Sequence, residues 1–449
     1  MHFKLKLVKG LIGTAGVVAA LAGSSASALT LEESVQMALK SYPSIQKAQA
    51  ARMAIEGDLG VAKSRYRPTV DLALGYGAEY SNNPTTRAIG VTTGKNSRYL
   101  HRQEASITLT QVLFDGFSRD SEVDKQNALL KGAGYDIRDE AETVAADVVF
   151  SYVDILRYTE TQRLSEENLE VHSKILDNVK KRVDAGQSGI ADLQQATARQ
   201  ASARSRIAEV RLDLDKAKIA FNRLVGASAD DLSKPEFAVS MLPADLEAAI
   251  QQALDGSPLV ERSRSKSASA KADIGNARAG NYPTVLFQLS GSNNHDLDGS
   301  TGINKDALAM VRLNMNLYRG GADKAREQAA SNRHGESMAE LAQSQRQVEE
   351  EVRRAWSAME HQDEEVMGRF DQVLANGQVV DTYREEFDVG QRDLLDLLDS
   401  ENELFVSRTQ LVAAESSALY ARYLVVASMG QLVEKLGVTL PKAEAQAEQ

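Results

Sequence analysis

Residues 148–189 read VVFSYVDILRYTETQRLSEENLEVHSKILDNVKKRVDAGQSG, and the spacing of their apolar residues indicates the fold. The residues that recur in it every seventh position are Val148, Ile155, Gln162, Leu169, Leu176 and Val183. A sustained seven-residue repeat indicates helices that pack as a left-handed coiled coil. No proline interrupts residues 85–234, so a long helix is allowed there. We therefore predict a helix over 119–184, about 100 Å long at the usual rise, and a shorter one over 190–226.

The second half of the chain repeats the first. Residues 352–393 read VRRAWSAMEHQDEEVMGRFDQVLANGQVVDTYREEFDVGQRD and keep the same seven-residue spacing, and Pro43 and Pro68 have counterparts in Pro258 and Pro283. Internal repeats of this kind indicate one structural unit used twice. We predict an internally duplicated chain, with repeats over 29–234 and 235–439. Each repeat holds a helix, a strand pair, a long helix, a tip turn and a further helix, and the two short helices stack end to end beside the long one.

Two pairs of strands are expected between the helices. Apolar and polar residues alternate over 70–80, 105–114, 285–289 and 311–317. Segments of about ten alternating residues are typical of outer-membrane barrels, although an ordinary surface hairpin is the alternative. Four strands cannot close in lipid; two chains would give a barrel filled by its own side chains, and three a barrel with a lumen. We predict a mixed α and β fold: a trimeric, twelve-stranded transmembrane β-barrel with four strands per chain, continued by a coiled-coil helical tunnel.

The composition narrows the functional classes. Residues 1–28 resemble a signal peptide, with three lysines, a short apolar run and a small-residue end, and 440–449 are expected to be a disordered tail. The formal net charge is −11, which disfavours nucleic-acid binding. Cysteine is absent, the six histidines lack a metal-ligand spacing, and there is no Walker-type loop. We expect no metal, no cofactor and no enzymatic activity, with energy supplied by a partner.

Three motifs carry a resemblance to a known family. They are Leu-Phe-Asp-Gly at 113–116 and the tip sequences at 184–193 and 388–399. With them, residues 30–430 resemble the TolC family of outer-membrane channel proteins. The resemblance implies a homotrimer with a barrel in the lipid of the outer membrane and a helical tunnel across the periplasm of a Gram-negative bacterium. It also implies a periplasmic adaptor protein and an inner-membrane pump as partners.

The resemblance also bears on the cargo. Residues 148–157 are most similar to members that serve type I protein secretion, and the N-terminal lipidated cysteine frequent in drug-efflux members is missing. We therefore expect the exit duct of a tripartite secretion system that passes unfolded polypeptide from an inner-membrane ABC transporter. The alternative is the outer-membrane component of a multidrug or metal efflux pump, with a proton-driven partner. A structural coiled coil without a pore is a third possibility.

The residues that control passage through the tube are expected at its narrow end. Asp396 and Asp399 are three residues apart and share a helix face, so three chains would bring six carboxylates into a cation-selective ring. The alternative is that they only complement a helix N-terminus. By resemblance, these aspartates form the closed periplasmic gate, and Arg392 with Asp192 forms a latch that joins one hairpin to the other. Phe387 stands where some members have a tyrosine hydroxyl in that latch.

The two tip turns are the expected adaptor contact. By resemblance, Gly186 and Gly390 match glycines implicated in adaptor docking, and Gln187 and Gln391 follow them in the same turns.

Overall fold

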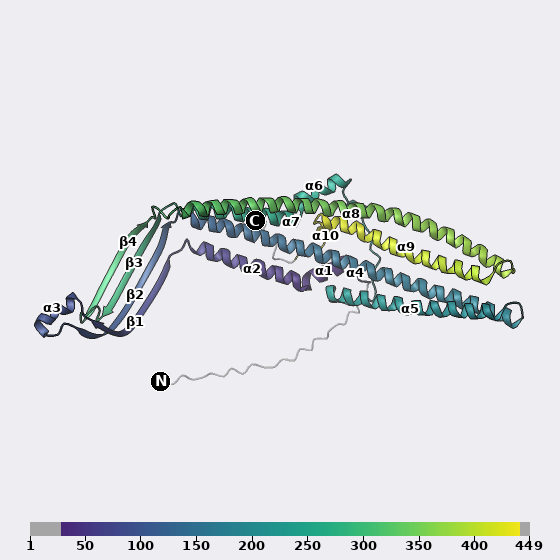
Figure 1. The fold of residues 1–449 in the computed structure, drawn as a ribbon, viewed down its shortest axis with the longest axis horizontal. Helices are drawn as coiled ribbons and strands as arrows, with labels where there is room; N and C mark the ends of the chain where they lie inside the picture. Colours follow the sequence, from purple (N-terminus) through teal and green to yellow (C-terminus); the bar gives the residue numbers. More distant parts are fainter. Residues whose placement is uncertain (1–27, 441–449) are drawn as a thin grey trace, which may run out of the picture.

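The computed structural model describes residues 28–440, so the predicted signal peptide and tail lie, but for one residue each, outside the described range. The molecule is elongated, with a small sheet at one end and the tips of two long helical hairpins at the other (Figure 1). No helix within the described residues has both the length and the apolar character needed to cross a membrane.

The two halves of the chain have the same order of elements. In the first half they are α2 (Pro43–Ser64), β1 (Thr69–Ser81), β2 (Arg98–Phe114), α4 (Ser118–Asp184) and α5 (Ile190–Val225). In the second they are α7 (Pro258–Ala279), β3 (Thr284–His295), β4 (Ile303–Asn314), α8 (Ala322–Asp388) and α9 (Leu394–Ser428). Shorter elements complete the fold: α1 (Leu31–Ser41), α3 (Pro84–Thr93), a 3-10 turn (Val239–Met241), α6 (Leu246–Gly256) and α10 (Leu432–Lys435). The predicted duplication and the two long helices are confirmed.

The lengths of the helices explain the shape. Helix α2 has 22 residues and α5 has 36, and together they approach the 67 residues of α4. They lie one after the other along α4, and α7 and α9 do the same along α8 (Figure 1). Each half is therefore one long helix beside two stacked short ones, as the sequence predicts.

The main hydrophobic core lies about midway along the helices. Val148 and Val352 occupy corresponding heptad positions, and both are 0% exposed. Tyr152, also 0% exposed, packs against Phe221, and its hydroxyl lies 2.6 Å from the carbonyl oxygen of Ser233. The same hydroxyl lies 2.7 Å from the carbonyl oxygen of residue 29, so this one side chain fixes both the start of the described chain and the connection between the repeats.

The four strands form one antiparallel sheet in the order β1-β2-β3-β4. Strands β1 and β4 are its edges, so each leaves one row of backbone groups unpaired within the chain. Apolar side chains on β1 are open to solvent, with Leu74 73% and Tyr76 77% exposed. Exposed apolar side chains and unpaired strand edges are typical of surfaces that contact lipid or other chains.

Three strand predictions were wrong in extent, since β3 runs to His295 rather than 289, and β4 and β2 also differ. Strand β4 was expected at 311–317 but runs from Ile303 to Asn314, because it pairs with β3 from His295 back to Thr284, the first residue after Pro283. Residues 315–317 then have no strand beside them. Strand β2 begins at Arg98, earlier than the expected 105, because it pairs along the whole of β1. The loop between β1 and β2 contains the unpredicted helix α3, which begins with a capping box formed by Asn83 and Thr86.

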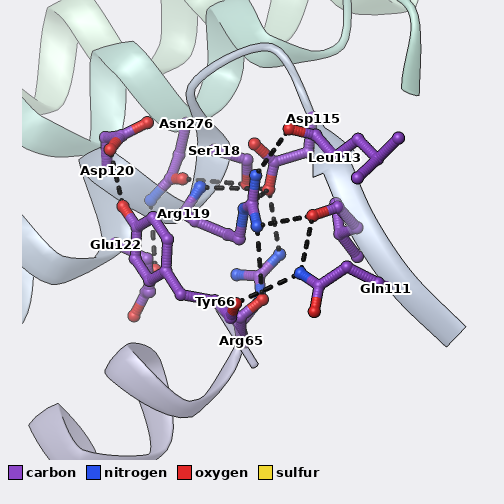
Figure 2. A network of polar contacts seen from close by, with 11 residues as sticks. Arg65, Tyr66, Gln111, Leu113, Asp115, Ser118, Arg119, Asp120, Glu122 and Asn276 are labelled. Atoms are coloured by element: carbon purple, nitrogen blue, oxygen red, sulfur yellow. Dashed lines mark hydrogen bonds and ion pairs between the residues drawn. The ribbon is translucent and has the colours of Figure 1, made fainter. Parts of the chain in front are cut away.

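The Leu-Phe-Asp-Gly motif joins the sheet to α4 (Figure 2). The Asp115 carboxylate forms an ion pair with Arg119 at 3.2 Å. The buried Arg119 side chain also donates a hydrogen bond to the carbonyl oxygen of Val112 at 3.0 Å. The guanidinium of Arg119 lies over the ring of Tyr66, 4.8 Å from its centroid. Gly116 has φ +69°, and a Cβ there would lie 2.7 Å from the carbonyl oxygen of Ala279. This network fixes the angle between strands and helices.

Candidate functional site

The two hairpin tips have the same turn. Gly186 and Gly390 adopt φ of +69° and +78°, which favours glycine over residues with a Cβ. The N–H groups of Gln187 and Gln391 donate to the carbonyl oxygens five residues earlier, both at 2.8 Å. These bonds close the last turns of α4 and α8 in the Schellman pattern. The backbone conformation alone explains both glycines, because a Cβ at either would meet nothing within 4 Å.

A small hydrophobic cluster joins the two hairpins just behind the tips. Its buried members are Ile175, Val179, Ala196, Phe387, Leu394, Leu397 and Leu398, drawn from α4, α5, α8 and α9. All four long elements therefore meet here. Any widening of the tip must disturb this cluster.

The Asp396 carboxylate lies in the first turn of α9 and is 48% exposed. Arg392, in the turn before, donates to it at 3.3 Å. The same guanidinium is closer to Glu386, at 2.8 Å, and lies 4.1 Å from the centroid of the Tyr383 ring. Arg392 is thus shared between two carboxylates, so its positive charge offsets that of Asp396 only in part.

Asp399 has a different partner. Its carboxylate, 52% exposed, forms an ion pair with Arg199 of α5. This ion pair connects the first hairpin to the second, and the sequence analysis did not identify it. The two residues are 200 positions apart, so no local pattern indicates the contact.

The predicted latch residues do not meet within one chain. Asp192 caps α5, accepting from the hydroxyl of Ser188 at 2.6 Å and from the N–H of Gly189 at 3.1 Å. Arg392 stays with Glu386 and Asp396 on its own hairpin. Both residues therefore lie at the tips, but each one pairs only with groups of its own hairpin.

Phe387 contacts the other hairpin without a hydroxyl. It is 5% exposed, and the guanidinium of Arg182 on α4 lies 4.5 Å from its ring centroid. Arg182 also donates to the carbonyl oxygen of Asp388 at 3.1 Å. A cation–π contact and a hydrogen bond thus join α4 to the end of α8. Arg182, like Arg199, was missed from the sequence because its partner lies in the other repeat.

His172 is a buried titratable group near the tip. It is 3% exposed, and its Nδ1 has no hydrogen-bond partner among residues 28–440. Burial and then the charge of Arg199 lower the pKa of the His172 imidazole below its ordinary value. The neutral form is therefore favoured near pH 7. Within the described part of the chain, no group of three or more acidic, histidine or cysteine side chains is placed to hold a metal ion.

Comparisons with known proteins agree with this architecture. The family model described as "Outer membrane efflux protein" matches residues 34–227 and 249–431. The "Outer membrane efflux protein BepC" of Brucella suis is 25% identical over 437 residues, covering 96% of this chain and 92% of that one. The "Proteases secretion protein PrtF" of Dickeya chrysanthemi is 23% identical, covering 90% and 89%. The crystal structure of the outer membrane protein VceC from Vibrio cholerae has a TM-score of 0.73 at 18% identity, covering 92% and 97%.

Proposed function

The chain belongs to the outer membrane efflux protein family, as an outer-membrane channel that extends into the periplasm, and we propose that it is the exit duct of a type I protein secretion system. Its inner partners would be a periplasmic adaptor and an ABC transporter, which pass unfolded polypeptide to it. As a channel of this family, it is not an enzyme.

The observation that carries the secretion proposal is the sequence at 148–157, which resembles secretion members of the family. These residues contribute Val148 and Tyr152 to the main core, so their resemblance extends over the packed centre of the molecule. The similarity to a protease secretion protein over 90% of the chain supports the same proposal. The alternative, an efflux duct for drugs or metals, is favoured by the similarity to an efflux protein over 96% of the chain.

The geometry supports a homotrimeric duct. The free edges of β1 and β4 fit pairing between neighbouring chains, and the exposed apolar side chains of β1 fit contact with outer-membrane lipid. Helix α4, with 67 residues, would reach about 100 Å into the periplasm. In this proposal three sheets form a twelve-stranded barrel, and the helices form a tunnel below it.

The tips would be both gate and docking surface. Asp396 and Asp399 from three chains would surround the narrow opening. Because Arg392 and Asp192 do not meet within a chain, a latch between them requires neighbouring chains of the trimer. The exposed turns with Gly186, Gln187, Gly390 and Gln391 would receive the adaptor.

A deletion strain tests the cargo. Its culture supernatant would be compared with that of the parent by proteomics, and drug and metal susceptibility measured on the same cells. Loss of one or a few large secreted proteins with unchanged susceptibility supports secretion. Intact secretion with sharply raised sensitivity moves the protein to efflux, and both defects together indicate a shared duct.

The proposed gate has its own test. The double variant Asp396→Ala, Asp399→Ala, measured as purified protein in planar bilayers, should have higher single-channel conductance and weaker block by multivalent cations. Unchanged conductance and block would refute the gate. A parent protein without any conductance would instead favour the structural coiled coil.

A further inference from the structure

The two aspartates of the proposed gate have different electrostatic surroundings. Asp396 shares Arg392 with Glu386, and the guanidinium is nearer Glu386, at 2.8 Å against 3.3 Å. Asp399 has Arg199, which makes no other ion pair within the described residues. Arg392 is therefore shared by two carboxylates, whereas Arg199 pairs with one.

The groups around Arg199 leave it free to serve Asp399 alone. His172 of α4 lies close enough for the charge of Arg199 to affect its pKa. The buried imidazole favours the neutral form, so it does not compete with Arg199 as a cation for Asp399. On α9, Glu401 is 5% exposed and forms its own ion pair with Arg384 of α8. Arg199 is thus the cation that balances Asp399.

We propose that Arg199 determines the cation selectivity of the entrance, because it masks the charge of Asp399 and joins α5 to α9. The closed entrance then presents the ring of Asp396 to passing cations, while Asp399 serves as a link between hairpins. This inference rests on the proposed function, a trimeric channel gated at the tips. It divides the two aspartates of that gate into different roles.

Removing Arg199 should add a second acidic ring. In Arg199→Gln, three Asp399 carboxylates lose their partners at the opening. For a trivalent cation, three more negative charges at roughly 8 Å, with physiological screening, correspond to about tenfold tighter block. The Arg199→Lys variant keeps the charge and should retain the parental block.

The assay is block of single-channel conductance by La³⁺, added on the tip side of purified trimers in neutral phosphatidylcholine bilayers. Arg206→Gln is the matched control, because Arg206 lies seven residues further along α5 on the same face and pairs within α5 with Glu209. It should change the half-blocking concentration less than about twofold. The double variant Arg199→Gln, Asp399→Asn should return to the parental value, since the unmasked charge is then gone.

The double variant Arg199→Gln, Asp399→Asn provides a second test if Arg199→Gln alone does not assemble. Masking predicts that this double variant leaves the block within about twofold of the parent, because the removed ion pair carries no net charge, whereas Asp396→Asn weakens it strongly. An Arg199→Gln variant with parental block, beside an Asp396→Asn variant that has lost it, overturns the inference but leaves the proposed gate intact. Equal weakening by Asp396→Asn and by the double variant Arg199→Gln, Asp399→Asn also overturns it. A block that Asp396→Asn does not weaken overturns the gate itself.

Discussion

The contact between Arg182 and Phe387 predicts how firmly the tips are held together. Arg182→Met removes the cation–π contact, 4.5 Å from the ring centroid, and the hydrogen bond to the carbonyl oxygen of Asp388. At a half-exposed site these two interactions together are worth about 1–2 kcal/mol per chain. If three chains open together, the closed state loses about 3–6 kcal/mol, and its equilibrium with the open state shifts by roughly a hundredfold to ten-thousandfold.

The assay is open probability in single-channel recordings of the purified trimer. Lys181→Met is the matched control, since it removes the same charge from the same last turn of α4. A double-mutant cycle with Phe387→Leu tests the ring as partner: Arg182→Met should have a smaller effect when the ring is absent. Equal open probability in the Arg182→Met and Lys181→Met variants would refute the reasoning, and so would full additivity in the cycle.

Three further predictions concern stability, measured by thermal unfolding in detergent. Gly116→Ala should destabilise by more than about 2 kcal/mol, through its positive φ and the overlap at the Ala279 carbonyl, whereas Gly57→Ala in α2 should stabilise slightly; equal effects would contradict this. Burial raises the pKa of Glu142 to about 7, so the folded state holds a proton that the unfolded chain releases, and stability should fall from about pH 4.5 to pH 7. Glu142→Gln should flatten that slope, and an unchanged slope would count against it. The lowered pKa of His172 gives stability the opposite pH dependence, so stability should be lost as the pH falls below about 6.5. His172→Leu should remove that loss, and a loss that persists in the variant would contradict the prediction.

The helical part of the fold was predictable because it depends on local periodicity. Val148 and Val352 recur in a seven-residue pattern without proline, and both are fully buried. The extent of β4 was not predictable in this way, since Asn314 ends the strand only because its partner Thr284 begins β3. Helix α3 did carry a readable signal, the Asn83-Pro84 start with Thr86 two residues further on.

The candidate site was predictable only in part, because local spacing can be read from the sequence but contacts between distant segments cannot. Asp396 and Asp399 stand out because their spacing places them on one face of a helix. The partner of Asp399 could not be identified, because Arg199 lies in the other hairpin and its pairing depends on how the hairpins are packed. The turn glycines were visible from the sequence, since a positive φ restricts Gly186 and Gly390 locally.

The distribution of buried residues explains how the tips could open while the rest of the molecule stays folded. The main core contains large side chains such as Tyr152 and Phe221, whereas the tip has a separate and much smaller cluster. Between the two, α4 buries the polar residues Thr161, Ser165 and His172 and only one large apolar side chain, Leu164. Polar side chains contribute little apolar burial, so α4 is stabilised less by apolar burial in this interval than in the main core. Local opening has the lowest free energy where apolar burial is least. The tip is held by its small hydrophobic cluster together with ion pairs and the Arg182–Phe387 contact, and these can separate without disturbing the main core.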